Sequence, residues 1–314
     1  MNRKALNLRV PSLLPCMSMH HKILISGWVA IVIASSGFAG CKRPEPPPDI
    51  RTVLQSSDGA GTISCPVRGG FTPDSGYYSQ FYEDYVLGYV FKDVAQGTYV
   101  DVGANDPSVN SVTRHFYDRG WRGINIEPIP ALAGKLRSQR PNDVNLAIGI
   151  SDVVGELTFY QSDPLVISTF DAEVMRGHKA KGIKFEEIKI PVSTLNAVFE
   201  QQQPLVGGGI TFLNADVEGY EKQVFSGIDF QRYQPQVIMA ESTAPNTEIP
   251  THQAWESILT SAGYVFAMDD GLNRYYVQNS RRNLLPRFLE INYCVGLDKL
   301  AKGLKLDGFR KVGT

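Results

Sequence analysis

The sequence predicts an α/β domain built on a doubly wound, mostly parallel sheet with a C-terminal antiparallel hairpin. Short apolar or β-branched segments alternate with helical stretches, and such strands are typical of a parallel sheet buried on both faces. The segment 264–278 contains two strand-like runs around a Gly-containing turn, which indicates the hairpin. The other expected strands are 98–103, 123–128, 144–149, 156–160, 188–192, 210–216 and 236–242.

The first helix is expected within residues 79–94, ahead of the first strand. Its apolar residues recur at steps of three and four, as one face of a helix requires, and Gly97 ends it. A later amphipathic helix is expected over Thr251–Ala262. The chain has 43% hydrophobic residues and a net charge of −1 over 314 residues, as ordinary globular proteins have. This charge does not favour a nucleic-acid partner.

Residues 1–41 have the pattern of an export signal or a membrane anchor. The segment contains basic residues and no acidic one, and its apolar run Trp28–Ala34 is too short to span a bilayer by itself. The sequence FAGC that ends at Cys41 resembles the lipobox of bacterial lipoproteins, which implies a lipidated Cys41. An uncleaved anchor is the alternative. We therefore expect membrane association through the N-terminus, with the side of the membrane left open.

The remaining chain divides into three parts. Residues 42–76 are rich in Pro, Gly and Ser and are expected to be a linker, whereas 77–280 form the folded domain and 281–314 a C-terminal extension. Cys65 and Cys294 are the only cysteines after residue 41, and no CxxC or Cys/His spacing of a zinc site is present. No metal site is therefore assigned.

Polar residues follow the first two expected strands. In an open doubly wound sheet, ligands bind outside the carboxyl ends of the strands. Asp101, Gly103 and Asn105 lie at the end of the first strand and just after it. Glu127 lies at the end of the second, where a carboxylate can accept the hydroxyls of a ribose. The glycine pattern of a dinucleotide site is incomplete, which disfavours a nicotinamide-dependent oxidoreductase and favours an adenosine ligand without a pyrophosphate, such as S-adenosylmethionine. An ordinary strand–turn–helix with a capping Asp or Asn is the structural alternative.

Several motifs in a fixed order resemble the FkbM-type methyltransferases, a branch of the class I S-adenosylmethionine-dependent enzymes with a Rossmann-like fold. The resemblance covers 79–278 and rests on SQFYED (79–84), YVDVGAND (99–106), GINIEP (123–128), NLAIGISD (145–152), STF (168–170), VSTLN (192–196), DVEGYEKQVF (216–225) and DGLNRYYV (270–277). It implies that Asp101, Gly103 and Asn105 hold the methionine portion of the cofactor. Glu127 would hold its ribose, and Asp152 would lie near the adenine.

The resemblance also implies transfer of a methyl group to an acceptor oxygen. Asp216 and Glu218 follow the strand 210–216 and are the candidates for the general base, because neighbouring carboxylates raise each other's proton affinity. The alternatives are that Asp216 caps the next helix, or that these carboxylates bind a hard divalent cation. The family often has Lys at the position of Asn214, so a role for that lysine does not carry over.

The leading hypothesis is an O-methyltransferase that acts on a hydroxyl of a sugar or glycan. The opposing hypothesis is a surface-tethered, non-catalytic binding module that keeps the fold, because S-adenosylmethionine is made in the cytoplasm and an exported domain would lack it. The expected partners are a small-molecule or glycan acceptor and, through the N-terminus, a membrane. The segment 162–187 carries several Lys residues and is expected to be a solvated basic loop or a lid over the acceptor.

Overall fold

The computed structural model describes residues 76–292, all of which belong to one unit of the chain, 49–314. The predicted signal with Cys41, nearly all of the linker and residues 293–314 of the extension lie outside the described residues. Within 76–292, every helix is too short or too polar to cross a membrane.

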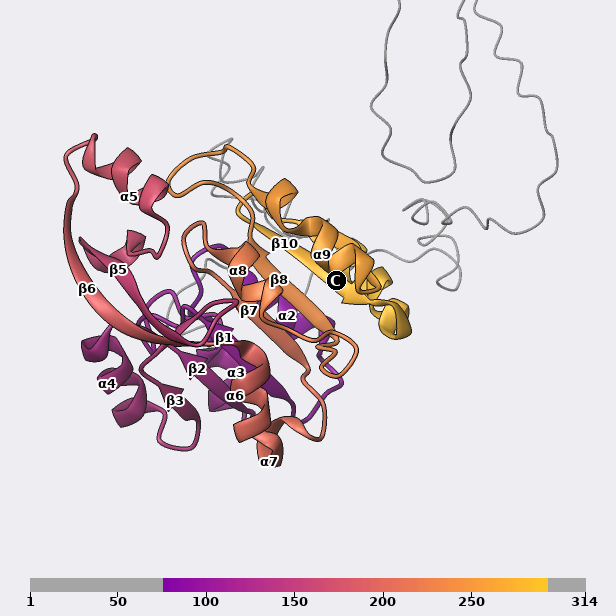
Figure 1. The fold of residues 1–314 in the computed structure, drawn as a ribbon. Coiled ribbons are helices and arrows are strands. Elements are labelled where there is room, and N and C mark those ends of the chain that lie inside the picture. Colours follow the sequence, from indigo (N-terminus) through magenta and orange to yellow (C-terminus); the bar gives the residue numbers. More distant parts are fainter. Residues whose placement is uncertain (1–75, 293–314) are drawn as a thin grey trace, which may run out of the picture. The chain divides into compact units, whose positions relative to one another are not determined.

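The centre of the domain is a seven-stranded sheet with the order β3-β2-β1-β7-β8-β10-β9 (Figure 1). Neighbours among β3, β2, β1, β7 and β8 are parallel, whereas β10 runs antiparallel to both β8 and β9. The predicted fold class is therefore confirmed, with the strand order reversing between β1 and β7. The strands are β1 Thr98–Val102, β2 Arg122–Ile126, β3 Val144–Leu146, β7 Phe212–Ala215, β8 Val237–Glu241, β9 Tyr264–Asp269 and β10 Asn273–Gln278.

A second sheet of three strands, β4-β6-β5, lies outside this series. β5 (Gly155–Asp163) and β6 (Lys184–Ser193) form a long antiparallel ribbon, and β6 also pairs in parallel with the short β4 (Gly149–Ile150). The prediction that 156–160 and 188–192 continue the parallel series is wrong, and the strand expected over 144–149 is divided between two sheets. The physical reason is that one face of the ribbon is exposed, as antiparallel strands allow.

Helices cover both faces of the main sheet. One face packs against apolar residues of α6, α8 and α9, including Phe199, Phe225 and Leu259, and the other packs against α2 and α3 through residues such as Val86 and Phe116. The helices are α2 Glu83–Val90, α3 Arg114–Asp118, α4 Pro130–Gln139, α5 Ala172–Lys179, α6 Leu195–Gln201, α7 Gln203–Val206, α8 Glu221–Ser226 and α9 Glu256–Ser261, with 3-10 turns η2 Leu165–Ile167, η3 His252–Ala254 and η4 Asn279–Leu284.

The helix expected over 79–94 is shorter in the structure than the apolar pattern predicts. α2 begins after Tyr82, which has a left-handed φ of 77°, and it ends at Val90. Past the hairpin, the chain continues to pack on the sheet, because Leu284, Phe288 and Ile291 are buried in the same cluster as α2. Residues 281–292 of the predicted extension thus contribute to the core.

Candidate active site

A pocket opens at the carboxyl ends of β1, β2 and β7, beside the three-stranded sheet. Asp101, Gly103, Asn105 and Glu127 all line it, as the sequence predicts for the ends of adjacent parallel strands. Residues without an expected role complete its wall, although several of them belong to the motifs named above. They are Gln80, Asn110, Val112, Ile126, Ile129, Leu132, Ile148, Gly149, Ile150, Phe159, Leu165, Val166, Ser168 and Phe170.

Asp101 is held firmly at the end of β1. Its side chain is 2% exposed, Thr113 Oγ1 donates a hydrogen bond of 2.6 Å to Oδ2, and Asn214 Nδ2 donates one of 2.9 Å to Oδ1. Burial raises the pKa of Asp101, whereas the hydrogen bonds from Thr113 and Asn214 lower it. Asn214, at the position where the family often has Lys, thus supports the carboxylate of Asp101.

The turn after β1 requires a residue without a side chain at position 103. Gly103 has a φ of +84°, and a Cβ added there would lie 1.8 Å from the backbone oxygen of Asp216. The turns after β1 and β7 therefore touch through their backbones. This close approach brings the carboxylate after β7 to the same pocket as the turn after β1.

Glu127 is fastened to the turn after β1. Its Oε2 accepts a hydrogen bond of 2.9 Å from the backbone N–H of Asn105, and its Oε1 accepts one of 2.8 Å from the N–H of Ile129. Burial raises the pKa of Glu127 to about 7, and the two N–H donors oppose this shift. Each carboxylate oxygen retains capacity for a further hydrogen bond, so ligand hydroxyls can be accepted there.

Asp152 lies apart from these residues. Its side chain is exposed, accepts a hydrogen bond of 3.1 Å from Ser151 Oγ and does not line the pocket. Its contact with adenine stays a prediction. The nearest preceding residues that do line the pocket are the apolar segment Ile148–Ile150. The ring of Phe170 packs next to Gly149, since a Cβ added to Gly149 would lie 2.3 Å from that ring.

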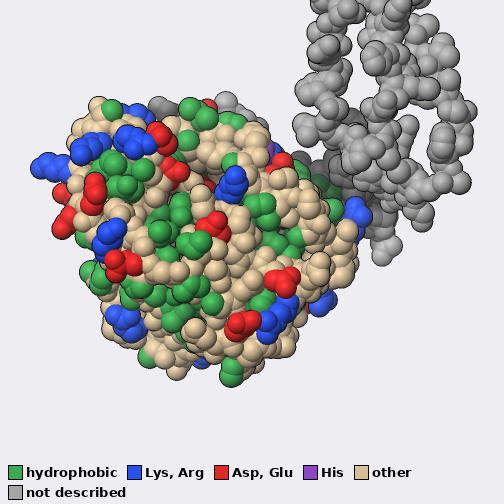
Figure 2. All heavy atoms as spheres, viewed as in Figure 1, with side chains coloured by type: hydrophobic (Ala, Val, Ile, Leu, Met, Phe, Trp, Pro, Cys, Tyr) green, Lys and Arg blue, Asp and Glu red, His purple; other side chains and the backbone are tan. Residues whose placement is uncertain are grey.

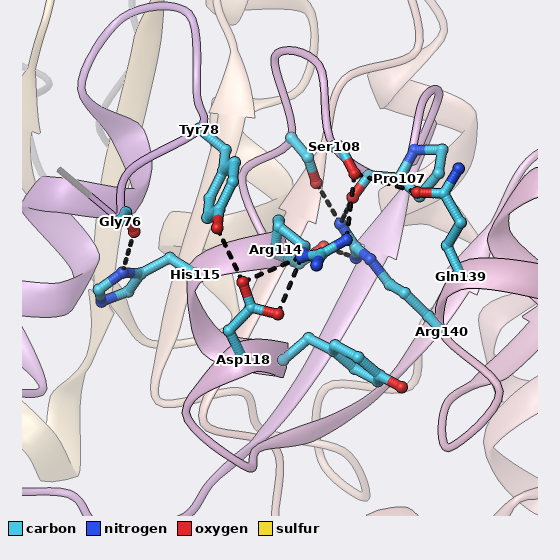
Figure 3. A network of polar contacts seen from close by, with 12 residues as sticks. Gly76, Tyr78, Pro107, Ser108, Arg114, His115, Asp118, Gln139 and Arg140 are labelled. Carbon is cyan, nitrogen blue, oxygen red and sulfur yellow. Dashed lines mark hydrogen bonds and ion pairs between the residues drawn. The ribbon is translucent and has the colours of Figure 1, made fainter. Parts of the chain in front are cut away.

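A buried arginine outside the motifs forms hydrogen bonds with the loop after β1. Arg140 is 0% exposed, and its guanidinium donates hydrogen bonds to Thr113 Oγ1, Ser111 Oγ and the backbone oxygen of Pro107. Figure 3 shows this side chain directed into the loop after β1, next to an outer network of Ser108, Arg114 and Asp118. Since Thr113 also binds Asp101, Arg140 connects the loop to the site.

Carboxylates gather where β7 and β8 end. Asp216 and Glu218 follow β7 and line the pocket, and Glu241 is the last residue of β8. One oxygen of each of these three carboxylates lies within 4.8 Å of the others. Glu221, at the start of α8, accepts the backbone N–H groups of Val217 and Gly219 at 3.3 and 3.2 Å and so shapes the turn that carries Glu218.

Burial and mutual repulsion keep protons on this group. Burial, followed by the charge of Asp101, raises the pKa of Asp216 to about 6. Burial and the charges of Asp216 and Glu221 raise the pKa of Glu218 to about 9, and the same causes raise the pKa of Glu241 well above its ordinary value. Of the two predicted bases, Asp216 is therefore ionised at neutral pH and Glu218 is protonated.

Different stretches of the segment 162–187 line the pocket and face the solvent, whereas a role as a lid over the acceptor stays a prediction. Leu165, Val166 and Ser168 line the pocket, whereas the Lys side chains at 179, 181 and 184 are exposed. Figure 2 shows basic side chains gathered over α5, with acidic ones among them. The solvated basic part and the part over the pocket are therefore different stretches of the same segment.

One comparison with known proteins identifies the family of this chain. Among solved structures, an O-methyltransferase from Bacillus cereus in complex with SAH is similar, with a TM-score of 0.33 and 10% identity over 74% of this chain and 92% of that chain. No curated protein matches the chain. The family model of the methyltransferase FkbM domain matches residues 101–266, more than half of the chain, and confirms the family that the motifs resemble. The chain therefore belongs to the FkbM methyltransferase domain family.

Proposed function

We propose that this protein is an S-adenosylmethionine-dependent methyltransferase that transfers a methyl group to a hydroxyl oxygen, on a sugar or glycan acceptor. The observation that carries the proposal is the position of Glu127 and of the turn after β1 across one pocket from the carboxylate of Asp216. A donor site and a proton acceptor thus face the same space.

The residues present fit the cofactor. Glu127 offers acceptor oxygens for the ribose hydroxyls, and Ile148 and Phe170 offer an apolar wall for the adenine. Asn214 Oδ1 is a buried acceptor without a hydrogen-bond partner in a residue that lines the pocket. A buried acceptor of this kind needs a donor, and the α-ammonium group of S-adenosylmethionine is one.

When bound, S-adenosylmethionine supplies an electrophilic methyl group on a positively charged sulfur. The chain must hold the acceptor in line with that group, exclude water and take up the hydroxyl proton. Asp216 lies on the pocket wall, and among residues 76–292 no hydrogen bond or ion pair engages its carboxylate. We assign to Asp216 the role of general base, which takes the proton of the acceptor hydroxyl. Glu218 in its protonated form would donate a hydrogen bond to an oxygen of the acceptor.

The acceptor class follows from the polar residues at the same pocket. Gln80, Asn110 and Ser168 contribute amide and hydroxyl groups to a wall that also carries carboxylates and apolar side chains. Amides and hydroxyls both donate and accept hydrogen bonds, which suits the hydroxyls of a sugar. Support for the glycan itself comes from the family resemblance of the motifs.

The test is calorimetric titration of the full chain with S-adenosylmethionine. We expect binding in the micromolar range, about −8 kcal/mol, and at least tenfold weaker binding by Glu127→Gln. Glu186→Gln, an exposed change on β6, is the control that leaves affinity unaltered. Absence of binding by the folded protein would refute the proposal. Incubation with methyl-labelled donor and a panel of oligosaccharides, followed by detection of methyl ethers, then tests the acceptor class.

We also propose that the chain is associated with a membrane through residues 1–41 and that Cys41 is lipidated. The apolar run 28–34 and the FAGC sequence support this proposal. Replacing Cys41 with Ser is expected to abolish incorporation of a labelled fatty acid in cells. Labelling that persists in this variant would exclude Cys41 as the modified residue.

A further inference from the structure

The tertiary structure brings Glu241 to two carboxylates, Asp216 and Glu218, that precede it by more than twenty residues in the sequence. β7 and β8 are parallel neighbours with Ala215 opposite Ala240, so Asp216 and Glu241 leave the sheet side by side. Glu218 reaches the same point from the turn after β7, where its φ of 55° is left-handed. Its backbone oxygen is held by Thr169 Oγ1 at 2.9 Å. Oxygen atoms of the three carboxylates consequently lie within 4.8 Å of one another.

The side chain of Glu241 indicates that the cluster binds a ligand from outside. Its side chain is 5% exposed, and its Oε2 is buried without a hydrogen-bond partner. Oε2 of Glu218 is also buried and unpartnered. Leaving a buried carboxylate oxygen without a donor or a cation is costly, so native proteins satisfy such atoms. Here both unsatisfied atoms belong to the same cluster.

No basic side chain compensates this charge among the described residues. The ion pairs within 76–292 all lie elsewhere, and the charges that act on Asp216, Glu218 and Glu241 are those of acidic residues, which raise each pKa further. The cluster therefore needs either protons or a cation from outside. Protons can neutralise individual carboxylates, but a cation relieves the repulsion between all three groups at once.

We propose that Asp216, Glu218 and Glu241 bind one hard divalent cation. Carboxylate oxygens are the ligands that Ca²⁺ and Mg²⁺ prefer, and the absence of Cys and His from the set disfavours Zn²⁺. Oxygens on opposite sides of Ca²⁺ are about 4.6–5.2 Å apart and those around Mg²⁺ about 4.0–4.2 Å. The present spacing thus admits Ca²⁺ directly and Mg²⁺ after small side-chain rotations.

The cation would have open coordination positions on the side of the pocket. Both ions take at least six oxygen ligands, and the cluster supplies three carboxylates. Asp216 and Glu218 line the pocket, so water or a ligand oxygen can complete the shell from there. The cation site does not rest on the proposed methyl transfer, but it involves two of the same carboxylates. With a cation bound, Glu218 would be an ionised ligand and would not donate the hydrogen bond proposed above. The sequence assigned no metal but left a hard divalent cation on Asp216 and Glu218 open as an alternative, and the structure adds Glu241 to that set.

The test is calorimetric titration of the metal-free full chain with CaCl₂ and, separately, with MgCl₂. We expect one cation per chain for at least one of the two salts. Glu241→Gln keeps the shape of the side chain and removes its charge, and it is expected to weaken binding at least tenfold. Glu186→Gln removes a charge from an exposed position on β6 and is expected to leave the affinity unchanged.

Two results would overturn the proposal. One is that the wild-type chain binds neither cation at millimolar concentrations, the weakest range of protein calcium sites. The other is equal affinity in the wild type and in folded Glu241→Gln, with folding checked by circular dichroism. The wild-type titration needs no variant and so does not depend on the variant's folding. Titration of the same samples with S-adenosylmethionine tests the donor site separately from the cation site.

Discussion

Replacing Gly103 with Ala tests whether the turns after β1 and β7 touch as closely as the structure indicates. The φ of +84° at this position costs an alanine about 1–2 kcal/mol. The new Cβ would also lie 1.8 Å from the backbone oxygen of Asp216, a separation that real Cβ atoms do not show. The two turns must therefore separate by roughly 1 Å, and overpacking of this kind costs about 1–3 kcal/mol more.

The matched control is Gly120→Ala. Gly120 has a φ of +89°, almost the same as Gly103, but a Cβ there would meet no atom within 4 Å. It is expected to lose only the conformational part, about 1–2 kcal/mol. Thermal unfolding followed by circular dichroism should show a fall in Tm of about 4–20 °C for Gly103→Ala and about 2–8 °C for the control.

Ligand binding supplies a second measurement. Separation of the turns moves Asp216 away from the turn after β1, so Gly103→Ala is expected to weaken S-adenosylmethionine binding while Gly120→Ala leaves it intact. If both variants lose the same stability and both keep full affinity, the close backbone approach between the two turns is wrong.

Three further predictions concern single side chains. Glu127, whose pKa is raised to about 7, accepts ribose hydroxyls best when ionised, so affinity for 5′-methylthioadenosine, which lacks an amino acid portion, should fall about tenfold from pH 8 to pH 6. Calorimetry that finds the same drop in Glu127→Gln would contradict this assignment. Arg140→Met leaves buried oxygens without their donor and should lower the free energy of unfolding by about 3–5 kcal/mol in urea, against a loss below 1 kcal/mol if the network is unimportant. Asp171→Ala removes the N-cap of α5 and should cost about 1 kcal/mol, seen as faster amide exchange within α5 and not in β1.

Glu127 also links pH to stability. Its folded-state pKa of about 7 lies above the ordinary 4.5, so ionisation opposes folding. Its cost is absent below pH 4.5 and grows as pH rises toward 7. The ionised form, which we propose binds a ribose, is therefore the form that destabilises the empty site. The two backbone N–H groups that donate hydrogen bonds to Glu127 reduce this cost.

The sequence by itself determined the fold class and the group of polar residues at one edge of the pocket. Nearly continuous apolar strands separated by helices require a sheet buried on both faces, and the carboxyl ends of adjacent parallel strands meet at one edge. Asp101, Gly103 and Asn105 on one strand and Glu127 on the next therefore had to lie together, as they do. Their positions depend on local pattern and on a topological rule, both of which are visible in the chain.

Only the tertiary structure decided the rest. The period of a strand does not say which sheet it joins, so β5 and β6 became a separate ribbon beside the pocket. An arginine is ordinarily exposed, and the burial of Arg140 depends on acceptors that the loop after β1 and strand β2 bring to it. Glu241 lies at the end of a strand, as Glu127 does. Its proposed role depends on Asp216 and Glu218, which lie next to it because β7 pairs with β8. Such a cluster is a property of long-range packing, because no local sequence pattern indicates which charged residues will be buried together.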